Sequence, residues 1–234
     1  MALSISQTRA LDGILHYGMF VASYGYPDMI APIGMVEKML QNAPNGKVHY
    51  RPDSESICKR HGLQSRPIPD AGSFFRSLGC SLDVYDIVEE RGGEIICDLN
   101  LPTIPRETYD IVLDVGTLEH VFNIAQAIKT MAGMVRVGGY IIHENPFNCA
   151  NHGFYNLNPT FFVDFYSENG FEVLSCQLAT REGQVADCPP VQRFKWEGRE
   201  LNIFVLARRV EVKEFTNPTQ TKYKPAAGVR AKET

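Results

Sequence analysis

The sequence has no apolar stretch of the roughly 20 residues that a membrane-spanning helix needs. Its N-terminus shows no basic segment followed by an apolar core and a cleavage site. An excess of positive charge is also missing, because 23 lysines and arginines face 27 acidic residues, a net charge of −4. We therefore expect a cytoplasmic protein that binds neither membranes nor nucleic acid.

Metal-ligand spacings and nucleophile motifs are missing too. The six cysteines form no CxxC pair, and no histidines follow them at a ligand spacing. Because several lie in apolar segments, we expect free structural thiols. His143, Glu144 and His152 match no metal-binding motif, so no metal is predicted. There is no G-x-S-x-G motif, which disfavours a serine hydrolase.

The composition is that of an ordinary globular protein, with 44% hydrophobic and 21% charged residues. We divide the chain into an N-terminal helical extension (1–42), an α/β domain (43–212) and a mobile C-terminal tail (213–234). Three roles for the extension remain open: packing against the sheet, covering a ligand cleft, or forming a homodimer contact.

Strand and helix patterns alternate along the domain, which favours parallel βαβ units. The last two predicted strands, 171–178 and 201–208, are separated by a helix-poor loop, so we expect them to form an antiparallel pair at the edge. The predicted fold class is a doubly wound, mostly parallel α/β sheet with an antiparallel C-terminal edge strand. The strands before that pair are 81–87, 93–98, 111–114 and 140–144, and the helices are 70–78, 118–135 and 159–169.

The segment YDIVLDVGTLEHVFN (109–123) is the most informative one. A buried strand ends at Asp114, Gly116 permits a tight turn, and Thr117 can cap a helix. Ligands of open α/β sheets bind outside the carboxyl ends of the strands. Negative charge in a first helical turn explains Glu119, and a catalytic role is the alternative. His120 is either a substrate-binding group and base or a hydrogen-bonded structural residue.

Three segments give residues 81–208 a resemblance to the class I S-adenosylmethionine-dependent methyltransferases. These are the strand that ends in Asp86, the segment YDIVLDVGTLEHV, and MVRVGGYIIHENP (134–146). The resemblance implies a Rossmann-like methyltransferase sheet and S-adenosylmethionine as cofactor. CDLN, DVGTLEHVFN and HGFYNLNPTFFVDFYSENGF look like a bacterial subgroup that accompanies glycan or surface-polysaccharide biosynthesis.

The resemblance also implies roles for particular residues in cofactor binding. Asp86 corresponds to the carboxylate that holds both ribose hydroxyls, and Asp98 with Leu99 to residues that flank the adenine. Asp114, Gly116 and Thr117 would line the methyl-transfer region. The alternative for the two acids Asp86 and Asp98 is an ordinary cap or turn aspartate.

The substrate side is predicted beside the strand that ends at His143. A polar and aromatic loop follows, with Asn148, Asn151, His152 and Tyr155, and such groups suit a small molecule or a sugar. His143 or His152 would accept the proton of a hydroxyl group during methyl transfer. The alternative is that His152 belongs to a well-packed loop.

One departure from the family lies at the first strand. The only candidate for that strand, KVHY (47–50), is followed by RPDSES (51–56), which contains no glycine. The family's glycine-rich loop lets the backbone approach the cofactor. Either side chains hold the cofactor here, or the chain no longer binds it. Methyl transfer to a small-molecule or sugar hydroxyl is the leading hypothesis. The alternatives are a non-catalytic binding or assembly module and a nucleotide-sugar-modifying enzyme of other chemistry.

Overall fold

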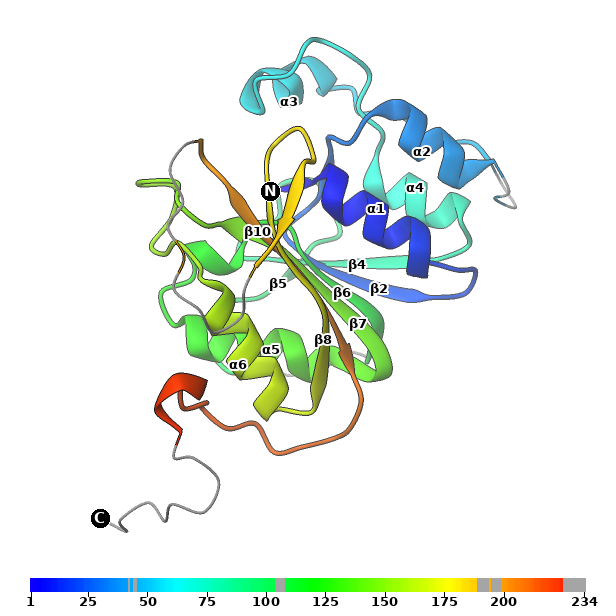
Figure 1. Cartoon of the computed structure of the whole chain (residues 1–234). Coiled ribbons are helices and arrows are strands. Elements are labelled where there is room, and N and C mark those ends of the chain that lie inside the picture. Colours follow the sequence, from blue (N-terminus) through cyan, green and yellow to red (C-terminus); the bar gives the residue numbers. More distant parts are fainter. Residues whose placement is uncertain (42, 44–45, 104–107, 189–193, 195–198, 225–234) are drawn as a thin grey trace.

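The computed structural model describes residues 1–41, 43, 46–103, 108–188, 194 and 199–224. An eight-stranded sheet forms the centre of the molecule, with helices on both faces (Figure 1). The sheet order is β5-β4-β2-β6-β7-β10-β8-β9. The bounds along this order are β5 (Ile95–Ile96), β4 (Ser81–Asp86), β2 (Phe20–Tyr24), β6 (Tyr109–Asp114), β7 (Val135–Pro146), β10 (Asn202–Arg209), β8 (Phe171–Ala179) and β9 (Val185–Asp187).

The strands from β5 to β7 are all parallel. β10 runs antiparallel to both β7 and β8, and the short β9 closes the edge antiparallel to β8. The expected antiparallel pairing of the last two long strands is therefore confirmed, with β10 inserted between β7 and β8. The doubly wound, mostly parallel fold class is confirmed as well.

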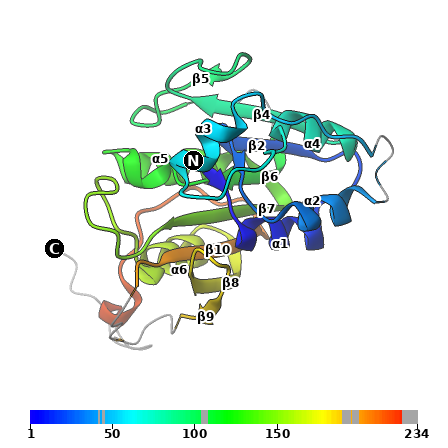
Figure 2. The same ribbon diagram turned by 90° about the horizontal axis from the view of Figure 1, so that it is seen from above.

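Helices from the two halves of the chain cover opposite faces of the sheet (Figures 1 and 2). One face carries α1 (Ile5–Ile14), α2 (Ile33–Leu40) and α4 (Ala71–Ser77), and the other carries α5 (Ile124–Met134) and α6 (Pro159–Glu168). A short helix, α3 (Ser54–Arg60), lies beyond the carboxyl ends of the strands. The remaining elements are the two-stranded pair β1 (Ala2–Leu3) and β3 (Asp28–Met29) and the 3₁₀ turns η1 (Leu118–His120) and η2 (Thr221–Tyr223).

The two layers of the core meet on β6, all of whose residues are buried. Ile111 and Leu113 pack on the α1, α2 and α4 side, whereas Val112 packs on the α5 and α6 side. This alternation follows from the two-residue period of a strand. A strand covered on both faces is continuously apolar, which is why the pattern was readable in the sequence.

The prediction for the first strand was wrong. The central strand is β2, which pairs in parallel with β4 on one side and β6 on the other. Tyr50 forms only an isolated bridge with Pro69. Residues 1–42 therefore do not form a separate helical extension, because they supply the middle of the sheet. Part of the predicted turn at 42–46 and of the predicted tail lies outside the described residues.

Some helices begin and end where the sequence predicts, and others do not. Asp70 caps α4 at the predicted start of the helix, because its side chain accepts a hydrogen bond from the Ser73 amide at 2.7 Å. The single helix predicted over 118–135 is instead divided into η1 and α5. Val121 between them has extended backbone angles (φ −98°, ψ 120°), which ends η1 after one turn. His120 is thereby placed at the end of a short turn.

Candidate functional site

The carboxyl ends of four strands meet at one edge of the sheet. Tyr24 of β2 pairs with Tyr85 of β4 and with Asp114 of β6, and Asp114 pairs with His143 of β7. The residues just after these positions therefore lie side by side. In this class of sheet that edge is where ligands bind.

Gly25 follows β2 and adopts a positive φ of 82°. Its amide donates to the Tyr85 carbonyl at 2.8 Å, so the turn is held against the neighbouring strand. A Cβ at Gly25 would lie 1.8 Å from the sulfur of Met1, which glycine alone avoids. The chain does place a glycine at the end of its first parallel strand, and the glycine-free segment 51–56 does not occupy that position.

The Met1 thioether lies against the bare backbone of Gly25. Its sulfur is 3.3 Å from the hydroxyl oxygen of Thr117, and this hydroxyl donates to the Tyr24 carbonyl at 2.6 Å. The start of the chain is fixed there by the Ala2 amide, which donates to the Val115 carbonyl at 3.0 Å. Thr117 and Gly116, both predicted as cofactor residues, thus lie beside the β2 turn.

Asp28 is a buried carboxylate near the same turn, and sequence reasoning missed it. Its oxygens lie 2.8 Å from Nη1 of Arg91, 2.9 Å from Nε2 of His61 and 3.5 Å from Nη1 of Arg60. Burial alone would raise the pKa of Asp28, but the hydrogen bonds from His61 and Arg91 outweigh burial and lower it. Met1, Asp28, Asp86 and Arg91 line a small cavity here of about 40 Å³.

The predicted adenosine residues follow two neighbouring strands, β4 and β5, and differ in their surroundings. Asp86 lies at the end of β4, lines this small cavity and accepts a hydrogen bond from the Ile87 amide at 2.8 Å. Asp98 is exposed, and its pKa is lowered by hydrogen bonds from the backbone and side chain of Asn100. Leu99 is buried in the core. The geometry of Asp98 is that of a turn aspartate.

Asp114 is fully buried at the end of β6 and accepts four hydrogen bonds. One oxygen accepts from the amides of Thr117 and Leu118, and the other from Asn145 and from Nδ1 of His143, both at 2.8 Å. Burial would raise the pKa of Asp114, but the bond from His143 is the main cause of its being lowered. The carboxylate thus fixes the turn that contains Gly116.

His143 is fully buried with both ring nitrogens engaged. Since a carboxylate only accepts, Nδ1 donates to Asp114, and Nε2 accepts from the hydroxyl of Tyr166 at 2.5 Å. Burial raises the pKa of Tyr166 well above its ordinary value. His143 therefore orients Asp114 and Tyr166, and neither of its nitrogens faces solvent. The grouping of His143 with Glu144 and His152 does not form, since Glu144 binds Ser4 and Asn202.

Three side chains converge just outside this buried group. Glu119 is buried, with one oxygen 3.5 Å from Nε2 of His152 and 3.8 Å from Nε2 of His120. The two imidazoles are about half exposed, and their ring centres are 5.3 Å apart. The neighbouring Glu119 carboxylate raises the pKa of His152.

The remaining predicted substrate residues divide into structural and exposed ones. Asn148 accepts a hydrogen bond from the Leu201 amide at 2.6 Å and so fixes the start of β10. Tyr155 donates to the Phe122 carbonyl at 2.9 Å. Asn151 is exposed at a positive φ of 58°. The rings of Phe122 and Phe154 are largely exposed and meet edge to face, at a centroid distance of 5.4 Å.

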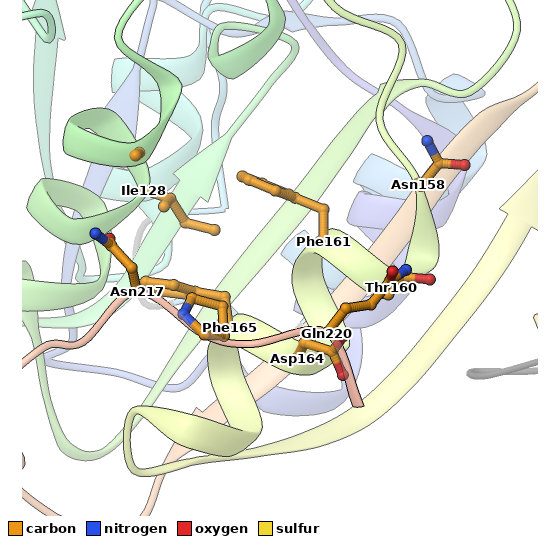
Figure 3. A pocket seen from close by; sticks show the side chains of 10 residues that line it. Ile128, Asn158, Thr160, Phe161, Asp164, Phe165, Asn217 and Gln220 are labelled. Carbon is orange, nitrogen blue, oxygen red and sulfur yellow. The ribbon is translucent and has the colours of Figure 1, made fainter. Parts of the chain in front are cut away.

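A larger cavity of about 610 Å³ lies elsewhere, between α5, α6 and the C-terminal segment (Figure 3). Phe161 and Phe165 of α6 and Ile128 of α5 form its apolar wall, and Asn217 and Gln220 border it. None of the predicted site residues lines it.

The residues that the sequence analysis missed have recognisable signals. An apolar run, FVASY (20–24), is followed directly by the turn residues Gly25 and Pro27, which is the pattern of a buried strand and its end. The prediction of a helical extension over residues 1–42 included this strand and so missed it. No local signal in the sequence shows that Tyr166, in the middle of α6, reaches His143.

No protein-family model matches the sequence, and no curated protein matches it. Solved structures of methyltransferases resemble the fold. One is the 1,6-didemethyltoxoflavin-N1-methyltransferase of Burkholderia thailandensis, with 13% identity and a TM-score of 0.47, covering 87% of this chain and 78% of that one. Another is the N-methyltransferase NodS of Bradyrhizobium japonicum WM9, with 15% identity and a TM-score of 0.47, covering 88% and 94%.

At these identities the likeness concerns the arrangement of helices and strands, and it says nothing of the chemistry. The sheet is the doubly wound, mostly parallel α/β sheet that the sequence predicted, with the antiparallel strand β10 next to β7. Among the described residues, no helix combines the length and the apolar character that crossing a bilayer requires.

Proposed function

We propose that the protein transfers a methyl group from S-adenosylmethionine to a small-molecule acceptor. The reaction would take place at the carboxyl ends of β2, β4, β6 and β7, called the strand-end edge below. The observation that carries this proposal is the turn at Gly25. Its bare backbone receives a thioether, that of Met1, beside the hydroxyl of Thr117. The methionyl sulfur of the cofactor would need the same surroundings: a backbone without a Cβ and a nearby polar group.

Three neighbouring positions fit the rest of the cofactor. Asp86, at the end of β4, would accept hydrogen bonds from the ribose hydroxyls. Gly116 and Thr117 would border the reacting methyl group. Asp98 and Leu99 would lie toward the adenine, with Leu99 contributing apolar surface. Ligand pockets measure about 300–1,000 Å³, so the 40 Å³ cavity must enlarge before a nucleoside fits. Withdrawal of Met1 and Arg91 would enlarge it.

The acceptor would bind beyond the end of β7, near the exposed loop that carries His152. Methyl transfer to a hydroxyl group needs positioning and one proton acceptor, because the sulfonium is already a strong electrophile. His152 suits this role better than His143, since its imidazole is half exposed. The exposed rings of Phe122 and Phe154, with Asn151, offer the stacking and hydrogen bonds that a sugar would use.

A specific observation favours the alternative of a non-catalytic binding or assembly module. Arg91 and His61 join to Asp28 in the space beside Asp86, and Met1 covers Gly25. In a protein that no longer bound the cofactor, these side chains would occupy the cofactor space without any loss of function.

Calorimetric titration with S-adenosylhomocysteine separates the two functions. We expect binding by the full chain and tighter binding by a chain that starts at Ala2, verified by mass spectrometry, because Met1 no longer covers Gly25. Asp86→Ala should weaken binding by about 1–3 kcal/mol, the scale of lost charge-assisted hydrogen bonds. Asp12→Ala, an exposed acid on α1 that pairs with Lys38, is the matched control and should leave affinity unchanged.

Absence of binding by both the full chain and the chain starting at Ala2 would reject the enzyme. If binding is seen, methyl transfer to candidate acceptors should rise with pH as His152 loses its proton, over a range above the ordinary histidine pKa because Glu119 raises it. A His152→Gln variant that kept the same activity and pH profile would remove His152 from the mechanism.

A further inference from the structure

Glu119, His120 and His152 form a cluster, of which the proposed function uses only His152, as proton acceptor. A metal ion bound to Nε2 of His152 would take over that role by acidifying a bound hydroxyl group. Each contributes one donor atom, and the three atoms lie within 4.8 Å of one another. They come from two segments: η1 supplies Glu119 and His120, and the loop after β7 supplies His152. The sequence alone did not suggest this group, because His152 lies 32 positions after His120 and the spacing matches no motif.

The distances in the cluster suit a tetrahedral metal ion. Zinc bonds to imidazole nitrogen and carboxylate oxygen are about 2.0–2.2 Å long, so neighbouring ligand atoms in a tetrahedron lie roughly 3.4 Å apart. The Glu119 oxygen is already 3.5 Å from Nε2 of His152 and 3.8 Å from Nε2 of His120. Small rotations of the two half-exposed imidazoles would complete the geometry without moving the backbone.

The buried Glu119 oxygen is independent evidence that a ligand belongs here. The glutamate side chain is only 1% exposed, and this Oε1 atom has no hydrogen-bond partner among the described residues. Buried oxygens are normally satisfied, because leaving one unpaired costs free energy. The contacts with the two histidines are longer than good hydrogen bonds, so the atom is aimed at a position that a cation would fill.

The surroundings hold Glu119 in place. Its other oxygen accepts a hydrogen bond at 2.9 Å from Asn145, which also donates to Asp114. A Cβ at Gly153 would lie 2.8 Å from the Glu119 carbonyl, so the loop that carries His152 packs directly on η1. Metal ligands are typically oriented by such supporting hydrogen bonds.

We propose that Glu119, His120 and His152 bind a zinc ion, with a fourth position open to an oxygen of a small molecule. Three protein ligands and one open position characterise zinc sites that handle substrates, whereas structural sites have four protein ligands. Imidazole donors favour zinc over magnesium, which prefers oxygen ligands. The exposed edges of His120 and His152 leave the fourth position accessible from solvent.

The test is calorimetric titration of the metal-free full chain with Zn²⁺, and in parallel with Mg²⁺. We expect one Zn²⁺ per chain, at least tenfold weaker binding in each of His120→Ala, His152→Ala and Glu119→Gln, and no saturable binding of Mg²⁺. His16→Ala removes an exposed histidine outside the cluster and should leave the Zn²⁺ affinity unchanged.

Because Glu119 is buried, thermal unfolding would first show whether Glu119→Gln is folded. The two histidine variants alter exposed rings, so they keep the proposal testable if that variant is unstable. Co²⁺ in place of Zn²⁺ should give the strong visible absorption of a tetrahedral site, and His152→Ala should lose it. Unchanged Zn²⁺ affinity in the two histidine variants, or absence of binding by the full chain, would overturn the proposal. S-adenosylhomocysteine plays no part in this titration, so its outcome is independent of cofactor binding.

Discussion

Two halves of the strand-end edge each bury one aspartate, and they satisfy it in opposite ways. Asp28, beside β2 and β4, is surrounded by long cationic side chains and a histidine from outside the sheet. Asp114, between β6 and β7, is held by two backbone amides, one side-chain amide and one buried imidazole. The partners in the first arrangement are the ends of long side chains and an imidazole, whereas the second includes backbone amides of the turn after β6.

A ligand can displace the partners of Asp28, so that half of the edge can open. The partners of Asp114 stay in place, so the other half is fixed. Arginine side chains have many rotamers and can withdraw into water, so the Asp28 side can enlarge around a ligand. The hydrogen bonds of Asp114 involve backbone that cannot move without unfolding the turn. A reacting group placed on that side would meet preorganised partners.

The largest expected effect comes from breaking the fixed half. Asp114→Ala should lower the free energy of unfolding by about 3–5 kcal/mol, because it leaves the partners of a buried charged group unpaired. Urea denaturation monitored by circular dichroism measures this loss. Asp98→Ala, at an exposed turn, is the control and should change stability by no more than about 0.5 kcal/mol. A loss below about 1 kcal/mol for Asp114→Ala would mean that the two halves do not differ in rigidity.

A smaller effect is expected on the half that can open. Asp28→Asn should cost about 2–3 kcal/mol near neutral pH, below the full value for a buried ion pair because Arg60 is half exposed. The pKa of Asp28 is lowered on folding. Its contribution is therefore present above the unfolded pKa of about 3.9 and is lost as pH falls through the folded one.

Denaturation of wild type and Asp28→Asn between neutral and acid pH gives the measurement. The difference in the free energy of unfolding between wild type and the variant should become smaller as the pH falls. Asp12→Asn, whose partner Lys38 is exposed, should cost less than about 1 kcal/mol and serves as the matched control. A difference in the free energy of unfolding that stays constant with pH would show that the cationic partners do not stabilise the charged form of Asp28.

The smallest effect concerns Glu144, the neighbour of His143 on β7. No cation pairs with it in the part of the chain that the structure describes, and burial raises its pKa despite hydrogen bonds from Ser4 and Asn202. Because the pKa of Glu144 is raised on folding, its contribution to the free energy of unfolding is highest below the unfolded pKa of about 4.3. That contribution falls as the pH rises through the pKa of Glu144 in the folded protein. Glu144→Gln should therefore gain stability at alkaline pH, by less than about 1 kcal/mol because one hydrogen bond must be re-formed.

Thermal unfolding at pH 4 and pH 8 tests this sign. The variant should match wild type at the lower pH and exceed it at the higher one. Glu168→Gln, an exposed acid paired with Lys224, should show no such dependence. A variant less stable than wild type at pH 8 would contradict the prediction.

The fold was predictable because its strands carry strong local patterns. β4, β6, α6 and β8 begin and end within two residues of their predicted bounds. The central strand β2 was missed, since its five residues continue the apolar pattern of the helix before it. Its apolar run fits either a strand or the end of a helix, and the pairing with β4 and β6 that decides between them is not a local property.

The site was predictable only in part, for the same reason. Asp86, Gly116 and Thr117 follow strands that the sequence marks clearly, so their positions at the edge were correctly expected. The isolation of His143 from solvent depends on Tyr166 of α6, 23 residues away. Likewise, the approach of His152 to Glu119 depends on the packing of Gly153 against η1. Such contacts arise from tertiary structure and leave no periodic trace in the sequence.

Asn145 also bears on the resistance of the protein to deamidation. Its one amide nitrogen donates to both Asp114 and Glu119, so conversion to aspartate would place three carboxylates together in a buried space. Asparagine usually deamidates when the backbone nitrogen of the next residue attacks its side chain. The next residue here is Pro146, whose nitrogen carries no hydrogen and cannot complete that attack. The amide that joins the fixed half of the edge to the zinc cluster is thereby protected from its commonest chemical damage.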